Sequence, residues 1–203
     1  MEKERERQNA MLAFEREARE RGFRRVAGID EAGRGPLAGP VVSAAVILPE
    51  NYFLDSLNDS KKVTPKNRES LFRRITADAI AWGVGLCDHV EIDEINILNA
   101  ARVSMGRAVR AFKPAPDFLL VDALTLDSAD MPQKAIVRGD ALSLSIAAAS
   151  IVAKVTRDRL MLIYDKMYPG YGFASHKGYG TKEHMDKIRA GGLCPIHRKT
   201  FCR

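Results

Sequence analysis

Apolar and polar positions along the chain follow two periods, one typical of strands and one typical of helices. A β-like run covers residues 25–30, and residues 41–48 are continuously apolar and rich in Val and Ile, as expected for a strand covered on both faces. Further strand-like runs cover 82–90 and 118–122. Because two strands come first and helices then alternate with strands, the pattern predicts an α/β fold with a mixed central sheet flanked by helices.

Helical periods occupy the intervening stretches and the N-terminus. Residues 2–21 alternate Glu and Arg around a thin apolar stripe, which predicts a charged N-terminal helix that either docks on the body or projects from it. Thr64 and Pro65 suit the cap and first turn of another helix. Residues 97–112 also predict a helix, and 141–168 predict a long one whose small side chains allow it to lie very close to the sheet.

The length and composition point to one compact domain. A chain of 203 residues, 46% of them hydrophobic, can bury a sizeable core, so we expect a charged helix at 1–23 and a single domain over 24–203. Apolar runs of membrane-spanning length do not occur and the N-terminus is too charged for a secretory signal, so we expect a cytoplasmic protein with no membrane partner. The three cysteines lack CxxC spacing, which suits reduced thiols.

The net charge of +6 is unevenly distributed along the chain. Residues 1–25 carry +2, residues 26–153 carry −3, and residues 154–203 carry +7. A basic segment joined to a slightly acidic body suggests one surface for a polyanion and a different role for the carboxylates elsewhere. A solvated surface explains the charge alone equally well.

Carboxylates close two of the strand-like runs, although burying an unpaired carboxylate is costly. Asp30 and Glu31 follow the first run and Asp122 ends the run at 118–122, with a fourth acid at Asp140. If the strand ends are neighbours, their oxygens form a cluster of the kind that Mg²⁺ or Mn²⁺ prefers. Each acid alone is also explained as a strand end beside a turn, and Asp140 as the N-cap of the long helix.

Glu31 needs one more condition to join such a cluster. Strand alternation points its side chain to the face opposite Asp30, so the chain must turn sharply at this point. Gly33 and Gly35 make such a turn easy.

The same glycines give the chain a rival interpretation. Residues 33–38 match the GxGxxA fingerprint of nicotinamide-dependent oxidoreductases, but that fingerprint must open a helix. Here Pro36 and Pro40 interrupt the segment and a β-like run follows. A glycine loop beside carboxylates is better suited to letting backbone amides approach a sugar or phosphate closely.

Several separated motifs are specific enough to indicate a family. The segment from Asp30 to Val41 closely resembles the signature of bacterial ribonuclease HII, and the similarity extends over about residues 24–203. The other matching segments are Asp59-Ser60-Lys61-Lys62, Glu91-Ile92-Asp93, Asn96-Ile97, Val121-Asp122-Ala123, Gly139-Asp140, the run from Ala149 to Asp158, the run from His176 to Thr181, and the run from His197 to Phe201.

This resemblance implies a ribonuclease H-like fold and a catalytic, metal-binding site of four carboxylates. By motif match these are Asp30, Glu31, Asp122 and Asp140. Asp158 also lies in a matching segment, but we interpret it as part of a helical charge network. The related ribonuclease HIII family carries its acids as Asp, Glu, Glu and Asp, so Asp122 after the Asp-Glu pair favours type HII.

The resemblance further implies an endonuclease that hydrolyses the RNA strand of RNA/DNA hybrids and cuts on the 5′ side of single ribonucleotides embedded in duplex DNA. Two Mg²⁺ or Mn²⁺ ions would supply the activated water and neutralise the transition state, leaving 3′-hydroxyl and 5′-phosphate ends. The expected partners are therefore hybrids or ribonucleotide-containing DNA, bound by a monomer.

Substrate contacts are also suggested by the resemblance. Backbone groups of Gly33, Arg34 and Gly35 are expected to read the ribose 2′-OH, and Tyr179 to abut the sugar, although an ordinary loop aromatic also explains Tyr179. The candidates for phosphate contacts are Lys61, Lys62, Lys154, Arg157, His176 and Lys177. Lys154 and Arg157 are preferred because their spacing places them on one helical face.

Two alternatives compete with these assignments. Cys194, His197, Cys202 and His184 could together supply four zinc ligands, but His184 would do so from a predicted helix, which disfavours a structural zinc site. A non-catalytic nucleic-acid-binding module, with a basic C-terminal region that binds and acids that are structural, predicts binding unchanged by EDTA and no product strands.

Overall fold

The computed structural model describes residues 2–127 and 129–202, apart from the side chain of Lys62, which lies outside the described residues. Its centre is a mixed five-stranded sheet in the order β3-β2-β1-β4-β5. The β1/β2 and β2/β3 pairs are antiparallel, whereas β1/β4 and β4/β5 are parallel. The strands are β1 (Val26–Ala32), β2 (Val41–Ile47), β3 (Ala81–Cys87), β4 (Phe118–Asp122) and β5 (Gln133–Ile136).

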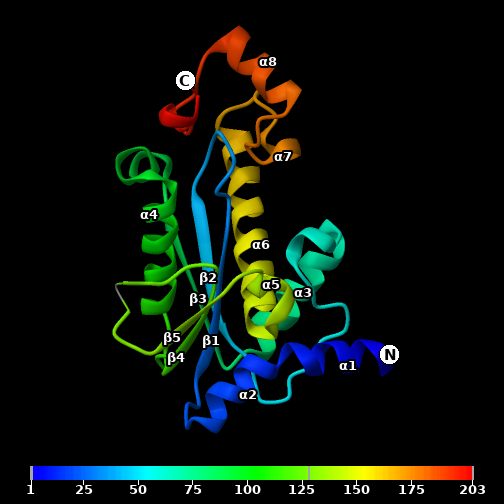
Figure 1. The fold of residues 1–203 in the computed structure, drawn as a ribbon. Coiled ribbons are helices and arrows are strands. Elements are labelled where there is room, and N and C mark those ends of the chain that lie inside the picture. The colour runs from blue at the N-terminus through cyan, green and yellow to red at the C-terminus, as the bar shows by residue number, and fades with distance from the viewer. Residues whose placement is uncertain (1, 128, 203) are drawn as a thin grey trace.

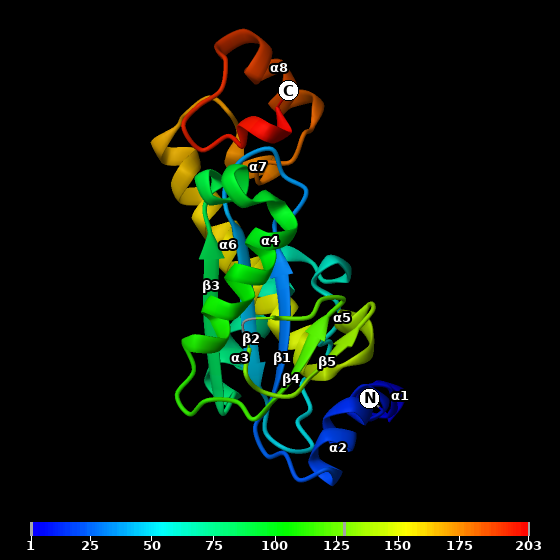
Figure 2. The ribbon, with the colours of Figure 1, turned by 60° about the vertical axis from the view of Figure 1, so that its left-hand side comes forward.

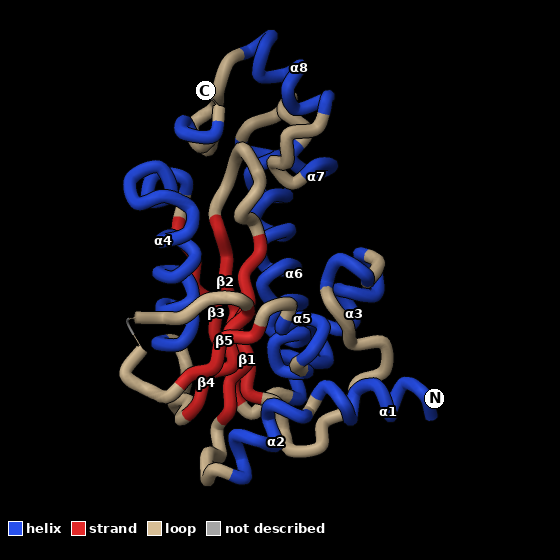
Figure 3. The backbone as a smooth tube through the Cα atoms, viewed as in Figure 1, coloured by secondary structure: helices blue, strands red, loops and turns tan. Residues whose placement is uncertain are grey.

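Helices cover both faces of the sheet, with α4 on one side and α6 on the other (Figures 1 and 3). None of the described helices is both long and apolar enough to cross a membrane. The helices are α1 (Glu2–Met11), α2 (Ala13–Glu20), α3 (Pro65–Asp78), α4 (His89–Arg110), α5 (Gly139–Leu142), α6 (Leu144–Met167), α7 (Phe173–His176) and α8 (Lys182–Gly191), with short 3-10 turns η1 (Ser60–Lys62) and η2 (Lys199–Phe201).

Strand alternation divides the core into two layers. Ala45 and Ile47 of β2 pack with Met105 on the α4 side, whereas Ala44 and Val46 pack against α6. All are fully buried, and burial of each large side chain contributes about 1.5–3 kcal/mol. The continuous apolar run predicted for a strand covered on both faces is therefore confirmed.

The close approach of α6 to β1 depends on small residues on both elements. The predicted run of small side chains at the start of α6, from Ala147 to Ser150, is buried. On β1, a Cβ added at Gly28 would stand 2.1 Å from the carbonyl carbon of Ser145, closer than any side chain tolerates. The close contact between β1 and the start of α6 therefore requires a glycine at position 28.

The charged N-terminal helix docks on the body rather than projecting from it. It breaks at Leu12 into α1 and α2, and Glu15 is buried at the start of α6. One Glu15 oxygen accepts hydrogen bonds from Ser143 Oγ at 2.7 Å, Ser145 N at 3.0 Å and Ser145 Oγ at 2.6 Å. A carboxylate is stabilised there because the N-terminus of a helix carries partial positive charge.

Two expected element boundaries were wrong, and one strand was not predicted. The strand predicted to reach residue 90 ends at Cys87, because Asp88 and Glu91 form a capping box that starts α4. The long helix begins at Leu144 with Ser143 as its N-cap, so Asp140 is not the cap but lies within the short α5. Strand β5 was not predicted, since it has only four residues and two of them are polar.

The C-terminal segment lies beyond one end of the sheet, and the N-terminal helices lie at the other (Figure 2). It contacts the glycine loop, which we define as residues 33–40. Ala38 and His197 form an isolated bridge, Gly39 N donates to Ile196 O at 2.9 Å, and Arg198 N donates to Leu37 O at 2.8 Å. Residues far apart in sequence are thus brought together at the end of β1.

Candidate active site

Asp30 and Asp122 lie on neighbouring parallel strands, directly after the last paired residues. The β1/β4 pairing ends with Ile29 opposite Val121, so the aspartates are the next residues on the two strands. Asp30 is buried, 5% exposed, and its Oδ1 accepts a hydrogen bond from Glu31 N at 2.7 Å. The predicted adjacency of the two strand ends is confirmed.

Glu31 lies beside them without the sharp turn that was expected at its position. Strand β1 continues to Ala32, and the left-handed turn comes at Gly33, with φ +100°. Glu31 Oε1 is 3.4 Å from Arg34 Nη1, whereas Oε2 is buried without a hydrogen-bond partner. A buried carboxylate oxygen without a donor indicates a place for a cation or a polar ligand.

Asp140 is held near Asp122 by the turn that starts α5. Gly139 N donates to Asp122 Oδ1 at 2.7 Å, so the residue next to Asp140 is fastened to the end of β4. Asp140 is 8% exposed, and its Oδ2 is 3.7 Å from Lys61 Nζ. The fourth acid therefore faces the same group, with an exposed lysine across from it.

Burial and mutual repulsion disfavour the charged form of these acids. Burial raises the pKa of Asp30 well above its ordinary range, and the charges of Glu31 and Asp122 raise it further. Burial also raises the pKa of Glu31, although nearby Arg34 lowers it, and burial raises the pKa of Asp122. The group therefore stores electrostatic repulsion that a divalent cation would relieve.

The donor set consists of oxygen atoms only and is open. Among residues 2–127 and 129–202, no three Asp, Glu, His or Cys side chains are close enough together to hold a metal ion by themselves. Mg²⁺ usually keeps several waters and is bound by one or two carboxylates together with substrate phosphates. The chemistry of the donors and the unpartnered Glu31 Oε2 fit such a hard cation.

A cleft of about 260 Å³ opens beside Asp30 and Glu31 and joins elements that are distant in sequence. Its remaining lining residues are Ala32, Gly33, Arg34, Gly35, Ser60, Lys61, Ser150, Lys154 and Tyr179. Most of the predicted site residues therefore face one cleft, which supports the interpretation that they act together.

Comparison with known proteins decides the family. A family model described as Ribonuclease HII matches residues 27–203. The chain belongs to the ribonuclease HII family. The ribonuclease HII of Acetivibrio thermocellus is 57% identical over 202 residues, which cover 100% of this chain and 79% of that one. That of Geobacter sp. (strain M21) is 58% identical over 191 residues, covering 94% of this chain and 83% of the relative.

Solved structures agree with this assignment. The crystal structure of the ribonuclease H2 from Pyrococcus horikoshii OT3 matches with a TM-score of 0.72 and 29% sequence identity, over 87% of this chain and 93% of that one. The predicted ribonuclease H-like fold and the choice of type HII are confirmed. As a member of the ribonuclease HII family, the protein is an endoribonuclease, which excludes the nicotinamide-dependent alternative.

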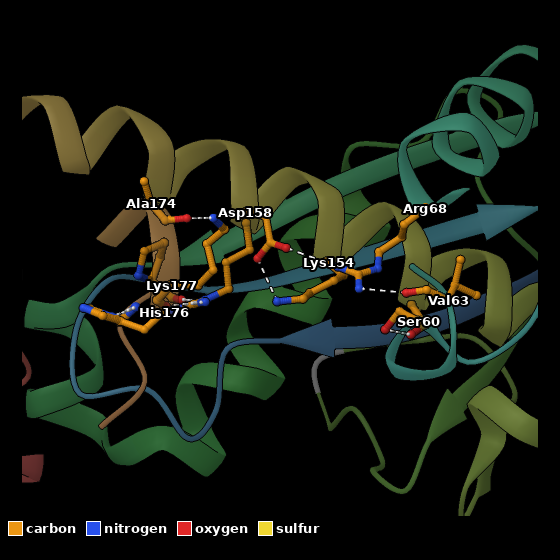
Figure 4. Close-up of polar contacts among 12 residues, drawn as sticks. Ser60, Val63, Arg68, Lys154, Asp158, Ala174, His176 and Lys177 are labelled. Carbon is orange, nitrogen blue, oxygen red and sulfur yellow. Dashed lines mark hydrogen bonds and ion pairs between the residues drawn. The ribbon is translucent and has the colours of Figure 1, made fainter. Parts of the chain in front are cut away.

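Lys154 is held in an ion-pair network at the rim of the cleft (Figure 4). Its Nζ donates to Asp158 Oδ1 at 2.7 Å, and Arg68 Nη1 donates to Asp158 Oδ2 at 3.2 Å. Asp158 thus belongs to a charge network outside the carboxylate group. Lys154 Nζ also lies 5.9 Å from the centre of the Tyr179 ring.

Lys61 reaches the cleft because hydrogen bonds hold the 3-10 turn η1 that carries it. Asp59 caps η1 by accepting from Lys61 N at 2.9 Å, and Ser150 Oγ donates to Ser60 Oγ at 2.8 Å. Burial lowers the pKa of Lys61, but the surrounding carboxylates, Asp59 first, raise it overall. The two serines were missed in the sequence, because a buried serine pair has no pattern of its own.

Two of the proposed phosphate contacts are contradicted by burial. Arg157 is 0% exposed and donates only to backbone carbonyls, so it cannot reach a phosphate. His176 is 8% exposed, and its two ring nitrogens are bonded to Tyr171 O and Gly178 N. The helical spacing of Arg157 with Lys154 was correct, but a helix face can turn toward a loop of the protein as readily as toward solvent.

Two further lysines belong to the proposed phosphate contacts. Lys177 is half-buried and its Nζ donates to Ala174 O (Figure 4). The side chain of Lys62 lies outside the described residues. Arg198, which no sequence argument selected, is fully buried against the glycine loop. The signal that could have found it is its place in the matching segment from His197 to Phe201.

The two histidines of the disfavoured zinc alternative use their ring nitrogens in hydrogen bonds. His184 Nε2 and His197 Nε2 are 3.0 Å apart, and His184 Nδ1 is 2.9 Å from Tyr179 O. His197 Nδ1 accepts from Cys194 N at 2.9 Å. Each of these histidines therefore uses its nitrogens to join segments of the C-terminal region.

Proposed function

We propose that the protein hydrolyses the RNA strand of RNA/DNA hybrids and cuts on the 5′ side of single ribonucleotides in duplex DNA, leaving 3′-hydroxyl and 5′-phosphate ends. The observation that carries this proposal is a cleft that opens beside Asp30 and Glu31 and is lined by a glycine loop, lysines and a tyrosine, with Asp122 and Asp140 near enough for their charges to raise the pKa of Asp30. Family membership supports the reaction class.

Asp30, Glu31, Asp122 and Asp140 are the proposed metal ligands. Two divalent ions, Mg²⁺ or Mn²⁺, would supply an activated water and neutralise charge on the transition state. The protein's own contribution is to hold these acids at the ends of β1 and β4 and at α5, in a buried place where their repulsion favours binding a cation.

The glycine loop and Tyr179 are the proposed readers of the sugar. A Cβ at Gly35 would meet only Tyr179, at 3.9 Å, and its φ is not in the left-handed region. The described structure therefore gives no internal reason for a glycine at position 35. Close approach of a ligand to the backbone explains it, and the 2′-OH is the group that distinguishes RNA from DNA at such a position.

Lysines around the cleft are the proposed phosphate contacts. Lys61 is 83% exposed and Lys154 lies at the rim, while Lys62 and Lys177 belong to the same proposed track. Their charges would bind the backbone of a duplex without regard to base sequence. We further propose that 24–203 forms the catalytic domain, that the charged N-terminal segment 1–23 docks on it, and that the protein acts as a monomer.

One experiment separates this function from that of a non-catalytic binding module. The purified protein is incubated with three matched duplexes: DNA, DNA with one ribonucleotide, and an all-RNA strand hybrid, each with Mg²⁺, Mn²⁺ or EDTA. We expect cleavage only of the duplexes that contain ribose, only with a metal, and on the 5′ side of the single ribonucleotide. Binding without product under every condition would support the module instead.

A further inference from the structure

Two buried arginines hold the inner side of the glycine loop. Arg198, just before η2, donates from Nη2 to Gly33 O at 2.7 Å, from Nη1 to Arg34 O at 2.9 Å, and from Nε to Gly39 O at 2.9 Å. All three hydrogen bonds go to main-chain carbonyls of one loop. The side chain spans the loop from its first residue nearly to its last.

Arg157 of α6 donates to other main-chain carbonyls, two of them in the same loop. Its Nε donates to Pro40 O at 3.0 Å, its Nη2 to Ala38 O at 3.2 Å, and its Nη1 to Lys177 O at 3.0 Å. It packs so closely that a Cβ at Gly33 would stand 2.1 Å from Arg157 Nε. Gly33 is therefore required by the arginine as well as by its positive φ.

Neither guanidinium is paired with an acid in the described part of the chain. The nearest candidates are engaged elsewhere, since Asp158 bonds Lys154 and Arg68, and Asp93 accepts from the main chain of Lys199 and Thr200. Burial, followed by the charge of Arg157, lowers the pKa of Arg198 to about 9, which is still above neutral pH. Two buried, unpaired charges are costly, so a role in holding the loop alone does not explain them.

Peptide geometry shows what the contacts of Arg198 do to the loop. A trans peptide points its carbonyl and the following N–H in opposite directions, and the peptides of this loop are trans. Because the carbonyls of Gly33 and Arg34 point inward to Arg198, the N–H groups of Arg34 and Gly35 point away from it. A guanidinium bonded to a carbonyl also polarises the peptide and strengthens its N–H as a donor.

We propose that Arg198 is a positioning residue that directs the Arg34 and Gly35 amides toward the ribose 2′-oxygen and its adjoining phosphate. This inference rests on the proposed function, because it names the group that makes the loop selective for ribose. Arg198 itself does not touch the substrate. It acts through the orientation of two peptide planes.

The test measures discrimination between two duplexes that differ by one 2′-OH. Affinities of both are measured with Ca²⁺ in place of Mg²⁺, and single-turnover cleavage of the ribonucleotide duplex is measured with Mg²⁺. Arg198→Lys keeps the charge but loses the guanidinium group. We expect the ratio of the affinities for the ribonucleotide and DNA duplexes to fall by about tenfold, because the oriented hydrogen bonds from the Arg34 and Gly35 amides to the ribonucleotide are lost. Affinity for the plain DNA duplex should change far less.

Arg157→Lys is the matched control. It removes a fork from the same loop and should lower the melting temperature by a similar amount, but the carbonyls it releases do not belong to the peptides of the Arg34 and Gly35 amides. Its affinity ratio should therefore stay within about threefold of the unmutated protein, less than one lost hydrogen bond would cause. Equal loss of discrimination in both variants, or none in Arg198→Lys, would overturn the proposal.

A measurement on the unmutated protein covers the case in which Arg198→Lys does not fold. Hydrogen exchange of the Arg34 and Gly35 amides is followed by NMR with each duplex. We expect both amides to be protected by the ribonucleotide duplex and not by the DNA duplex, and equal protection by both would overturn the inference. Failure of the unmutated protein to cut at the ribonucleotide would instead reject the proposed function.

Discussion

His184 Nε2 and His197 Nε2 lie 3.0 Å apart in the interior of the C-terminal region and share one hydrogen bond. Their other contacts fix the tautomers. His184 donates from Nδ1 to Tyr179 O, so its Nε2 accepts, and His197 donates from Nε2 because its Nδ1 accepts from Cys194 N. The pair holds its geometry only while both rings are neutral, and it links the backbone of Tyr179 to the C-terminal segment.

This pair predicts a loss of stability in mild acid. Burial is the main cause that lowers the pKa of both His184 and His197 below the ordinary 6.5. As the pH falls below 6.5, these histidines become protonated in the unfolded chain while they stay neutral in the folded protein. The free energy of unfolding therefore falls by up to about 1.4 kcal/mol per pH unit for each proton. Urea unfolding between about pH 5 and 8 checks this.

His184→Gln should be less stable at neutral pH, yet its stability should depend less on pH over the same window. His89→Gln, which changes a histidine outside the pair, should keep most of the dependence, because the charge of His89 is the smallest cause of the lowered pKa of His197. A His184→Gln variant with an unchanged pH slope would show that other groups cause the acid sensitivity.

The sheet and its acids could be predicted because they leave strong local signals. The apolar run that became β2 and the two apolar runs that lead into Asp30 and Asp122 formed strands as expected, and the two aspartates became neighbours because β1 and β4 pair in parallel. The position of the Glu31 side chain was harder to predict. It depends on where the chain makes its left-handed turn, at Gly33, and on where β1 separates from β4, and both follow from packing.

Buried polar contacts were the part that the sequence could not give. Arg157 and His176 are polar residues in matching segments, and these residue types are suited both to phosphate contacts and to buried hydrogen bonds with the main chain. Only the three-dimensional position of the glycine loop shows that Arg157 and Arg198 donate to its carbonyls. The N-cap of α6 was misassigned for a similar reason, because Asp140 and Ser143 are both good capping residues and differ only in where the helix starts.

Replacing a proposed metal ligand should abolish cleavage without loss of stability. In Asp30→Asn the amide oxygen can still accept from Glu31 N, while the charge that repels its neighbours is removed. We expect more than about a 10³-fold loss of turnover, since several kcal/mol of transition-state stabilisation are lost. Near-normal turnover at saturating metal would refute the site assignment.

The melting temperature of Asp30→Asn should be equal to or higher than that of the unmutated protein in EDTA, because the buried repulsion is relieved. Asp122→Asn should lose activity to the same degree. Asp158→Asn is a control outside the carboxylate group, and we expect it to retain metal-dependent cleavage with weaker substrate binding through Lys154.

Substrate affinity should fall steeply with salt, because lysines on phosphates release counterions. Lys154→Ala should make the slope of log affinity against log salt shallower by about one unit for a duplex. Arg159→Ala is a suitable control, since Arg159 lies on the same helix but pairs with Glu69 and packs over Phe72. An unchanged slope in Lys154→Ala would assign that lysine to the Asp158 network alone.

Selectivity for a single ribonucleotide should depend on Tyr179 and Gly35 in different ways. Tyr179 is 43% exposed at the cleft, and its fold-supporting contact is made by its main-chain oxygen, so Tyr179→Ala should leave the histidine pair intact. We expect it to reduce single-turnover cleavage at single ribonucleotides more than it reduces binding, because positioning matters most when the scissile phosphate meets the metals.

Gly35→Val should reduce both cleavage and binding, since a side chain would block close approach of the backbone, while stability should change little because nothing but Tyr179 is near. The measurement compares product ends, binding and single-turnover rates on DNA, single-ribonucleotide and all-RNA-strand duplexes. Equal loss on every substrate for Tyr179→Ala would mean that the ring supports the fold instead of reading the junction.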